Sequence, residues 1–188
     1  DDGMRTAKSG MWWENNPQRA LANNSFVAKR KPDMSVFMKE WFALYESKSG
    51  ERGIFSRAAS QSQAKKYGRR NPDFEFGTNP CSEIILRNRE FCNLTEVVVR
   101  ATDTAIDLHR KIRLATILGT WQSTLTDFKY LRKIWKDNTE EERLLGVSLT
   151  GQFGHKFFSG KEDINKLETV LGQLREYART INSEEAEK

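Results

Sequence analysis

The sequence predicts an α/β fold built around a parallel strand–helix–strand crossover. Val97-Val98-Val99 is a run of β-branched residues, which is typical of a buried strand. A helix opened by Thr102-Asp103 follows, and a second buried strand is predicted from Leu144 to Leu149, closing on Thr150-Gly151. The apolar residues on one face of that helix are Leu108, Ile112, Ala115 and Leu118. Because parallel strands need a long connection, usually helical, this order favours a parallel sheet.

The segments before this unit are predicted to hold one helix and several extended stretches. Residues 1–32 show no regular period. A helix is predicted from Met34 to Tyr45, with Asp33 as its N-cap, and it should stop near Ser49-Gly50. Residues 56–73 are polar and are predicted to be rich in turns. The stretches predicted to be extended are 74–76, 84–86 and 91–99, with a loop over 77–83.

Two further helices are predicted, one over 127–135 and one over about 161–182. The second is amphipathic, because its apolar residues repeat in alternating threes and fours. These residues are Ile164, Leu167, Leu171, Leu174, Ala178 and Ile181. We interpret this stripe as facing the core, and a coiled-coil seam is the alternative.

Composition narrows the class of protein. The 188 residues are enough for one domain, and an aromatic content of 11% favours folding over disorder. The net charge of +5 raises the possibility of a nucleic-acid partner, but 26 acidic residues are spread among 31 basic ones and no known binding module is present. The basic clusters at 29–31 and 65–70 are therefore interpreted as solvated or phosphate-handling loops, with contact to a polyanion as the alternative. Neither nucleic acid nor a membrane is an expected partner, and two cysteines without a disulfide framework favour the cytoplasm.

The informative motif is Asn79-Pro80-Cys81-Ser82-Glu83-Ile84, followed by Phe91-Cys92-Asn93-Leu94. Pro80 disfavours helical dihedral angles at Asn79, so the first segment should be extended or looped. In an extended chain, side chains two residues apart point the same way, so Asn79, Cys81 and Glu83 would project together. A thiol can exchange a hydrogen atom, a carboxylate can accept a hydroxyl proton, and an amide can orient a hydroxyl group.

Two simpler interpretations stay open at this point. Cys81 could be a small buried hydrophobic residue and Glu83 an ordinary surface charge. A metal site is not expected, because Cys81, Cys92, His109 and His155 lack the spacing of metal ligands.

The motif pair resembles the finger-loop region of ribonucleotide reductases, and most closely the monomeric, adenosylcobalamin-dependent (class II) ribonucleoside-triphosphate reductases. Further segments have counterparts in the same order, and the likeness covers nearly the whole chain. These segments are Met4-Arg5-Thr6-Ala7, Gly53-Ile54-Phe55, Phe76-Gly77-Thr78 and Gly146-Val147-Ser148-Leu149-Thr150-Gly151. The resemblance implies a ten-stranded α/β barrel, of which residues 1–188 form part, with a finger loop at about 77–84.

The resemblance also implies residue roles in deoxyribonucleotide synthesis. Cys81 matches the thiyl-radical cysteine that abstracts the ribose 3′ hydrogen, and Glu83 matches the base that takes the 3′-hydroxyl proton. Asn79 matches the amide that binds the substrate hydroxyl groups, and Ser82 is expected to contribute to the same binding site. Cys92 matches one member of the redox-active dithiol that supplies two electrons. The implied cofactor is adenosylcobalamin, and the implied reductant is thioredoxin.

The resemblance further implies that this chain is part of a longer, allosterically regulated enzyme and is inactive alone. The dithiol needs a second cysteine, and pairing Cys92 with Cys81 would consume the radical carrier, so the partner is expected in the remaining segments of the enzyme. Two alternatives remain: the large subunit of a class I reductase that uses a separate metal-radical subunit, and a non-catalytic split-gene module.

Overall fold

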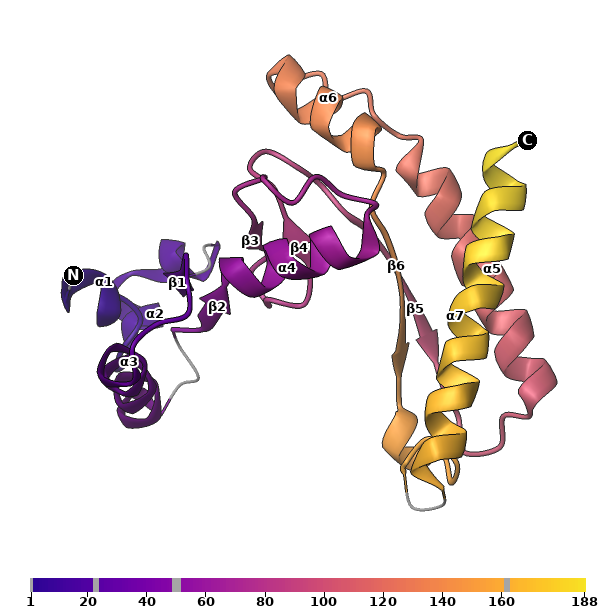
Figure 1. Ribbon diagram of the computed structural model, residues 1–188, viewed down its shortest axis with the longest axis horizontal. Helices are drawn as coiled ribbons and strands as arrows, with labels where there is room; N and C mark the ends of the chain where they lie inside the picture. The colour runs from indigo at the N-terminus through magenta and orange to yellow at the C-terminus, as the bar shows by residue number, and fades with distance from the viewer. Residues whose placement is uncertain (1, 22–23, 49–51, 161–162) are drawn as a thin grey trace. The chain divides into compact units, whose positions relative to one another are not determined.

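A computed structural model describes residues 2–21, 24–48, 52–160 and 163–188 (Figure 1). The chain divides into two compact units, residues 1–90 and 91–188. Each unit combines helices with short strands, so the α/β class is confirmed. The described residues form three two-stranded sheets and no closed barrel, and the ten-stranded barrel therefore stays a prediction. None of the described helices is both long and apolar enough to cross a bilayer.

The first unit contains two small sheets. Its elements are α1 (Asp2–Arg5), α2 (Trp12–Asn15), η1 (Pro17–Leu21), β1 (Phe26–Ala28), α3 (Met34–Ser47), β2 (Ile54–Ser56), α4 (Arg57–Tyr67), β3 (Gly77–Thr78) and β4 (Ile85–Leu86). Strands β1 and β2 pair in parallel across the α3 connection, and β3 and β4 form an antiparallel hairpin. The short elements before residue 30 were not predicted, because none is long enough to show a hydrophobic period.

Helix α3 confirms the helix predicted from Met34. Asp33 is its N-cap residue with an extended backbone, although its side chain makes no capping hydrogen bond. The helix ends at Ser47, with Lys48 in the left-handed region, and the predicted stop at Ser49-Gly50 lies outside the described residues.

Helix α4 corrects the prediction that residues 56–73 are mainly turns. The Ser56 hydroxyl accepts a hydrogen bond from the Ala59 N–H at its start, and Gly68 ends it in the left-handed conformation. Between these caps lie alanine, glutamine and lysine residues, which favour helix even without an apolar stripe. A polar composition alone predicts turns, and the helix is recognised only from its caps at Ser56 and Gly68.

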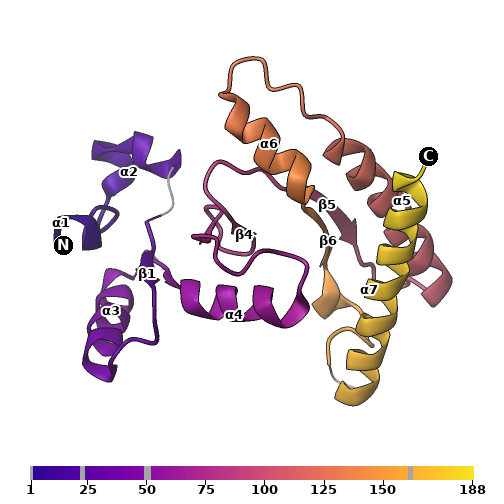
Figure 2. The ribbon, with the colours of Figure 1, turned by 45° about the horizontal axis from the view of Figure 1, so that its top comes forward.

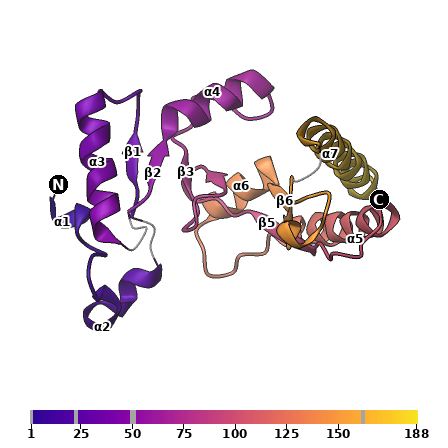
Figure 3. The same ribbon diagram turned by 90° about the horizontal axis from the view of Figure 1, so that it is seen from below.

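The second unit is the predicted parallel crossover. Its elements are β5 (Asn93–Val98), α5 (Ala105–Ser123), α6 (Lys133–Glu142), β6 (Leu145–Thr150), η2 (Gln152–Gly154) and α7 (Ile164–Ala186). Strands β5 and β6 pair in parallel from Asn93 with Leu145 to Val98 with Thr150. Helices α5 and α7 lie on the same side of this pair in all three views (Figures 1, 2 and 3). Val97, Val99, Leu108, Ile112 and Leu174 join the buried core between them.

Two helical details of this unit differ from the prediction. Leu118 was expected on the buried face of α5 but is 58% exposed, because Gly119 takes the place nearest the sheet, where the Leu145 side chain approaches the helix backbone closely. The helix predicted over 127–135 instead forms as α6 from Lys133 to Glu142.

The amphipathic C-terminal helix is confirmed as α7. The Asp163 carboxylate caps it by accepting hydrogen bonds from the Asn165 and Lys166 N–H groups, and residues 161–162 lie outside the described part. Leu174 and Ile181 are buried and the helix packs against α5, so this part of the stripe faces the core, whereas Ile164 and Leu171 of the predicted stripe are exposed.

Candidate active site on the β3–β4 hairpin

The loop that carries Cys81 is closed by three hydrogen bonds. The Asn79 N–H donates to the Ile84 carbonyl (3.2 Å), and the Ile84 N–H donates back to the Asn79 side-chain oxygen (3.0 Å). The Ser82 N–H donates to the Asn79 carbonyl (3.1 Å), so residues 79–82 form a β-turn. Pro80 and Cys81 occupy its two central positions, where the fixed φ of proline suits the first. The thiol therefore lies at the tip of a two-stranded hairpin.

This geometry corrects the extended arrangement predicted for Asn79, Cys81 and Glu83. Because residues 79–82 turn, the two-residue alternation of a strand does not apply there, and Ser82 adopts a positive φ of 66°. The looped alternative, also predicted from Pro80, is the one observed. Cys81, Ser82 and Glu83 are all exposed, whereas Asn79 is half-buried. Cys81 is therefore not a buried hydrophobic residue.

Asn79 has a structural task that sequence reasoning missed. Its side-chain oxygen must face the Ile84 N–H, because only an acceptor satisfies that donor, and this fixes the orientation of the amide. The NH₂ group then lies on the other branch of the amide, where it can donate to a bound hydroxyl. Closing the loop and binding a substrate are thus compatible for one side chain.

Cys92 lies in the second unit, directly before β5, and its side chain is half-buried. Its neighbours on both sides are anchored. The Phe91 ring stacks on Trp135 (4.8 Å between centroids) and contacts Phe128 edge-on (5.1 Å). Asn93 donates both its backbone N–H and its side-chain amide to the Leu144 carbonyl (2.9 and 3.1 Å). The backbone at Cys92 is thus held between an aromatic cluster and the parallel sheet.

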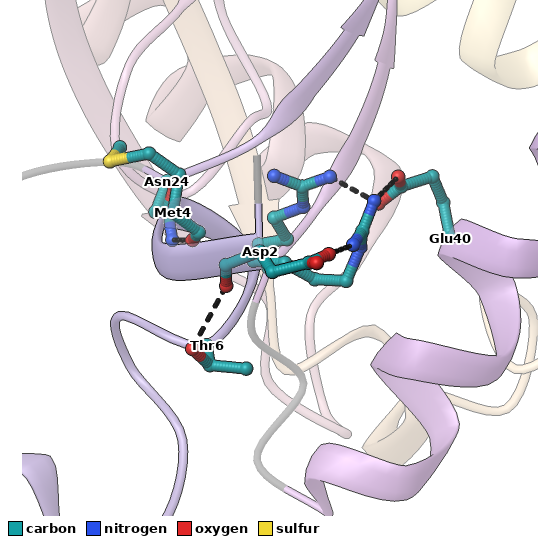
Figure 4. Close-up of polar contacts among 7 residues, drawn as sticks. Asp2, Met4, Thr6, Asn24 and Glu40 are labelled. Carbon is teal, nitrogen blue, oxygen red and sulfur yellow. Dashed lines mark hydrogen bonds and ion pairs between the residues drawn. The ribbon is translucent and has the colours of Figure 1, made fainter.

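A second polar cluster in the first unit was not predicted (Figure 4). Glu40 of α3 is buried and accepts hydrogen bonds from both Arg5, at 2.8 Å, and Arg52. Burial alone would raise the pKa of the Glu40 carboxyl, but the two guanidinium groups outweigh it and hold that pKa below its ordinary value. Arg5 also pairs with Asp2, and Asn24 donates to the Met4 carbonyl (2.7 Å). This cluster ties the chain start to α3.

The two histidines serve the fold of the second unit. His109 bonds through Nδ1 to the Ala105 carbonyl (2.8 Å), and His155 lies between the Asp103 carbonyl and the Phe158 N–H (3.1 and 3.4 Å). Within the described ranges, no group of three or more His, Cys, Asp or Glu side chains could hold a metal ion.

Comparison with known proteins gives a consistent result. The chain is 34% identical over 134 residues to the adenosylcobalamin-dependent ribonucleoside-triphosphate reductase of Lacticaseibacillus paracasei, which covers 65% of this chain and 17% of that protein. It is 31% and 33% identical, each over 136 residues, to the reductases of the same name from Lactobacillus helveticus and Lactobacillus gasseri. These matches cover 64% of the chain and 17% of each relative.

No family model matches the chain, and no solved structure matches it significantly. The chain spans about one sixth of the length of the curated relatives it matches. The similarity to adenosylcobalamin-dependent ribonucleoside-triphosphate reductases that the motif indicated is confirmed over about two thirds of this chain, and not over nearly its whole length.

Proposed function

We propose that this chain is part of the catalytic core of a longer enzyme that reduces ribonucleoside triphosphates to 2′-deoxyribonucleoside triphosphates by thiyl-radical chemistry. The observation that carries the proposal is the exposed Cys81 at the tip of a closed hairpin, in a chain homologous to such reductases. The names of those relatives also favour adenosylcobalamin over the separate metal-radical subunit of a class I enzyme.

The exposed thiol fits this cofactor, because a group bound outside the hairpin has to reach the sulfur of Cys81. When bound, adenosylcobalamin supplies the one-electron oxidising equivalent that removes the hydrogen atom from that sulfur. The thiyl sulfur of Cys81 then takes the 3′ hydrogen atom of the ribose and returns it at the end of the cycle.

The neighbouring residues handle protons and electrons. The Glu83 carboxylate accepts the 3′-hydroxyl proton, and the Asn79 NH₂ group, with Ser82 beside it, orients the substrate hydroxyls. The 2′-hydroxyl leaves as water, and the two electrons come from Cys92 and a second cysteine outside this chain, which end as a disulfide. Thioredoxin is the proposed reductant of that disulfide.

The test of this function is Cys81→Ser in the enzyme assembled with its remaining polypeptide. Turnover should fall more than about 100-fold, which is about 2.7 kcal/mol of barrier, because an O–H bond is too strong to act as a reversible hydrogen carrier. Nucleotide binding, measured by equilibrium dialysis, should persist. Turnover above about 1% of wild type would overturn the assignment of Cys81 and leave the non-catalytic module as the better hypothesis.

A further inference from the structure

A fully buried carboxylate lies at the root of the Cys81 hairpin. The Glu90 side chain has no exposed surface, and its Oε2 accepts a hydrogen bond from the Arg87 backbone N–H (2.9 Å) and from the Arg70 guanidinium (3.2 Å). The Arg87 Nε lies 3.5 Å from its other oxygen. One carboxylate thus joins the residue that follows β4 to the segment that follows α4. We call Arg70, Arg87 and Glu90 the Glu90 clamp.

The Glu90 clamp contacts β4 and the segment that leads into β3. Arg70 also donates to the carbonyl of Ile85 in β4 (2.8 Å), and its guanidinium lies 4.6 Å from the ring centre of Phe76, which directly precedes β3. Arg87 lies 4.5 Å from the ring centre of Phe74, and Phe76 is completely buried. Charge-assisted hydrogen bonds are directional, so these contacts restrict the angle of the hairpin as well as its position.

The β3–β4 ladder by itself gives the hairpin little support. Each hairpin strand has only two residues, and the ladder between them is correspondingly short. Arg70 follows α4, which is anchored separately, because Arg57 donates to the Phe76 carbonyl (2.7 Å) and Gln61 to the Phe74 carbonyl (3.2 Å). The hairpin is therefore joined to α4 in two ways, directly at the segment that precedes β3 and through the Glu90 clamp at β4.

We propose that Glu90 is a positioning residue for Cys81. It does not touch substrate, but it holds the base of the β3–β4 hairpin in place and so fixes the position of the thiol at the tip. The inference rests on the proposed function, in which Cys81 must meet a ribose carbon. A displacement of about 1 Å at a reacting atom can cost about 100-fold in rate, so a loosened root should lower catalysis while leaving nucleotide binding intact.

The experiment compares Glu90→Gln with Glu75→Gln in the assembled enzyme. Both substitutions remove a carboxylate charge paired with an arginine of the first unit, but Glu75 is 76% exposed and lies outside the Glu90 clamp. Glu90→Gln should lower kcat, and the cofactor-dependent exchange of tritium with water, about tenfold or more with an unchanged nucleotide dissociation constant. Amide hydrogen exchange should accelerate at Ser82 and Ile84, whose N–H groups close the hairpin loop. Glu75→Gln should change none of these.

Three results would count against the positioning role of Glu90 or against the proposed function. Unchanged kcat, or equal effects of both variants, would overturn the proposal. Faster amide exchange throughout the first and second units would overturn it as well, because Glu90 would then stabilise the fold generally. Faster exchange confined to the hairpin, in an enzyme whose wild type shows no reductase activity or tritium exchange, would leave the positioning of the hairpin standing and reject the proposed function.

Discussion

At the scale of single residues, the hairpin assigns separate tasks to neighbouring side chains. Asn79 closes the loop with its oxygen, whereas Cys81 and Glu83 project from it exposed. An exposed carboxylate can accept a proton from a bound group, and an exposed thiol is accessible to a reaction partner. Asn79 thus combines a structural task with its proposed role in substrate binding, whereas Cys81 and Glu83 are left exposed for the proposed chemistry.

Cys92 is expected to act separately from Cys81. Cys92→Ser removes one thiol of the proposed dithiol, so multiple turnover with thioredoxin should stop, while hydrogen transfer at Cys81 remains possible. The measurement is adenosylcobalamin-dependent exchange of tritium between the cofactor 5′ position and water in the assembled enzyme. Exchange that is lost in Cys92→Ser and kept in Cys81→Ser would mean that the two roles are reversed.

Glu40 should make the first unit sensitive to acid. Its folded pKa is lowered, against an unfolded value of about 4.3, so the stability it contributes is fully present above that value. This stability is lost as the pH falls through the lowered pKa, because the folded state then takes up a proton. Glu40→Gln should cost about 3 kcal/mol near pH 7, since the half-buried guanidinium groups of Arg5 and Arg52 lose the charge of a buried carboxylate.

The measurement for Glu40 is amide protection of α3 against pH, corrected for intrinsic exchange rates. The gap between wild type and Glu40→Gln should be constant above about pH 5 and narrow in stronger acid. A gap that stays constant down to about pH 2 would show that the charge of Glu40 does not stabilise α3.

At the scale of elements, α5 packs closely on the β5–β6 sheet at Gly119. A Cβ atom at Gly119 would lie 2.2 Å from Leu145 Cδ1 and 3.3 Å from Thr95 Cγ2. Gly119→Ala should therefore destabilise the chain by about 1–3 kcal/mol, although alanine is the better helix former.

The matched control for Gly119 is Gly172→Ala in α7, where a Cβ would meet nothing within 4 Å. This change should stabilise by about 0.5–1 kcal/mol, because it only improves helix propensity. Thermal unfolding followed by circular dichroism compares the two variants. A midpoint raised by both substitutions would show that α5 can move away from Leu145 at little cost.

The accuracy of prediction at this scale depended on the kind of signal. The β5–α5–β6 crossover and α7 were predictable because their apolar residues repeat with the period of the element that they form. Helix α4 carries no apolar period and depends on Ser56 and Gly68 as caps. The region before α6 is shaped by Phe128 and Trp135 packing on Phe91, a contact between residues far apart in sequence.

The candidate site also has parts that the sequence predicts and parts that it does not. Asn79, Cys81, Glu83 and Cys92 could be selected from the motif pair and its resemblance to a known family, although their roles stay proposals. The turn at 79–82 and the Glu90 clamp could not be predicted. The first depends on a side chain that closes its own loop, and the second on Arg70 meeting Glu90 twenty residues later.

At the scale of the whole molecule, large apolar side chains remain exposed in both units. On α3 they include Met34, Trp41 and Tyr45, and on α5 they include Ile106, Leu118 and Trp121. Every described sheet has only two strands, so each described strand keeps one edge without a strand partner. Such surfaces and edges are typical of protein that is covered in a larger assembly.

The 188 residues alone should therefore neither reduce nucleotides nor bind cobalamin tightly. Their helices should form, so circular dichroism should show helix, but the exposed apolar faces leave part of the packing energy unrealised. We expect a weakly cooperative thermal transition and binding of an anilinonaphthalene dye at neutral pH. Supplying the remaining polypeptide in trans should sharpen the transition and release the dye, because it would cover these faces and strand edges. A sharp two-state transition of the 188 residues without dye binding would identify a self-sufficient domain instead, and the non-catalytic module would become the better hypothesis.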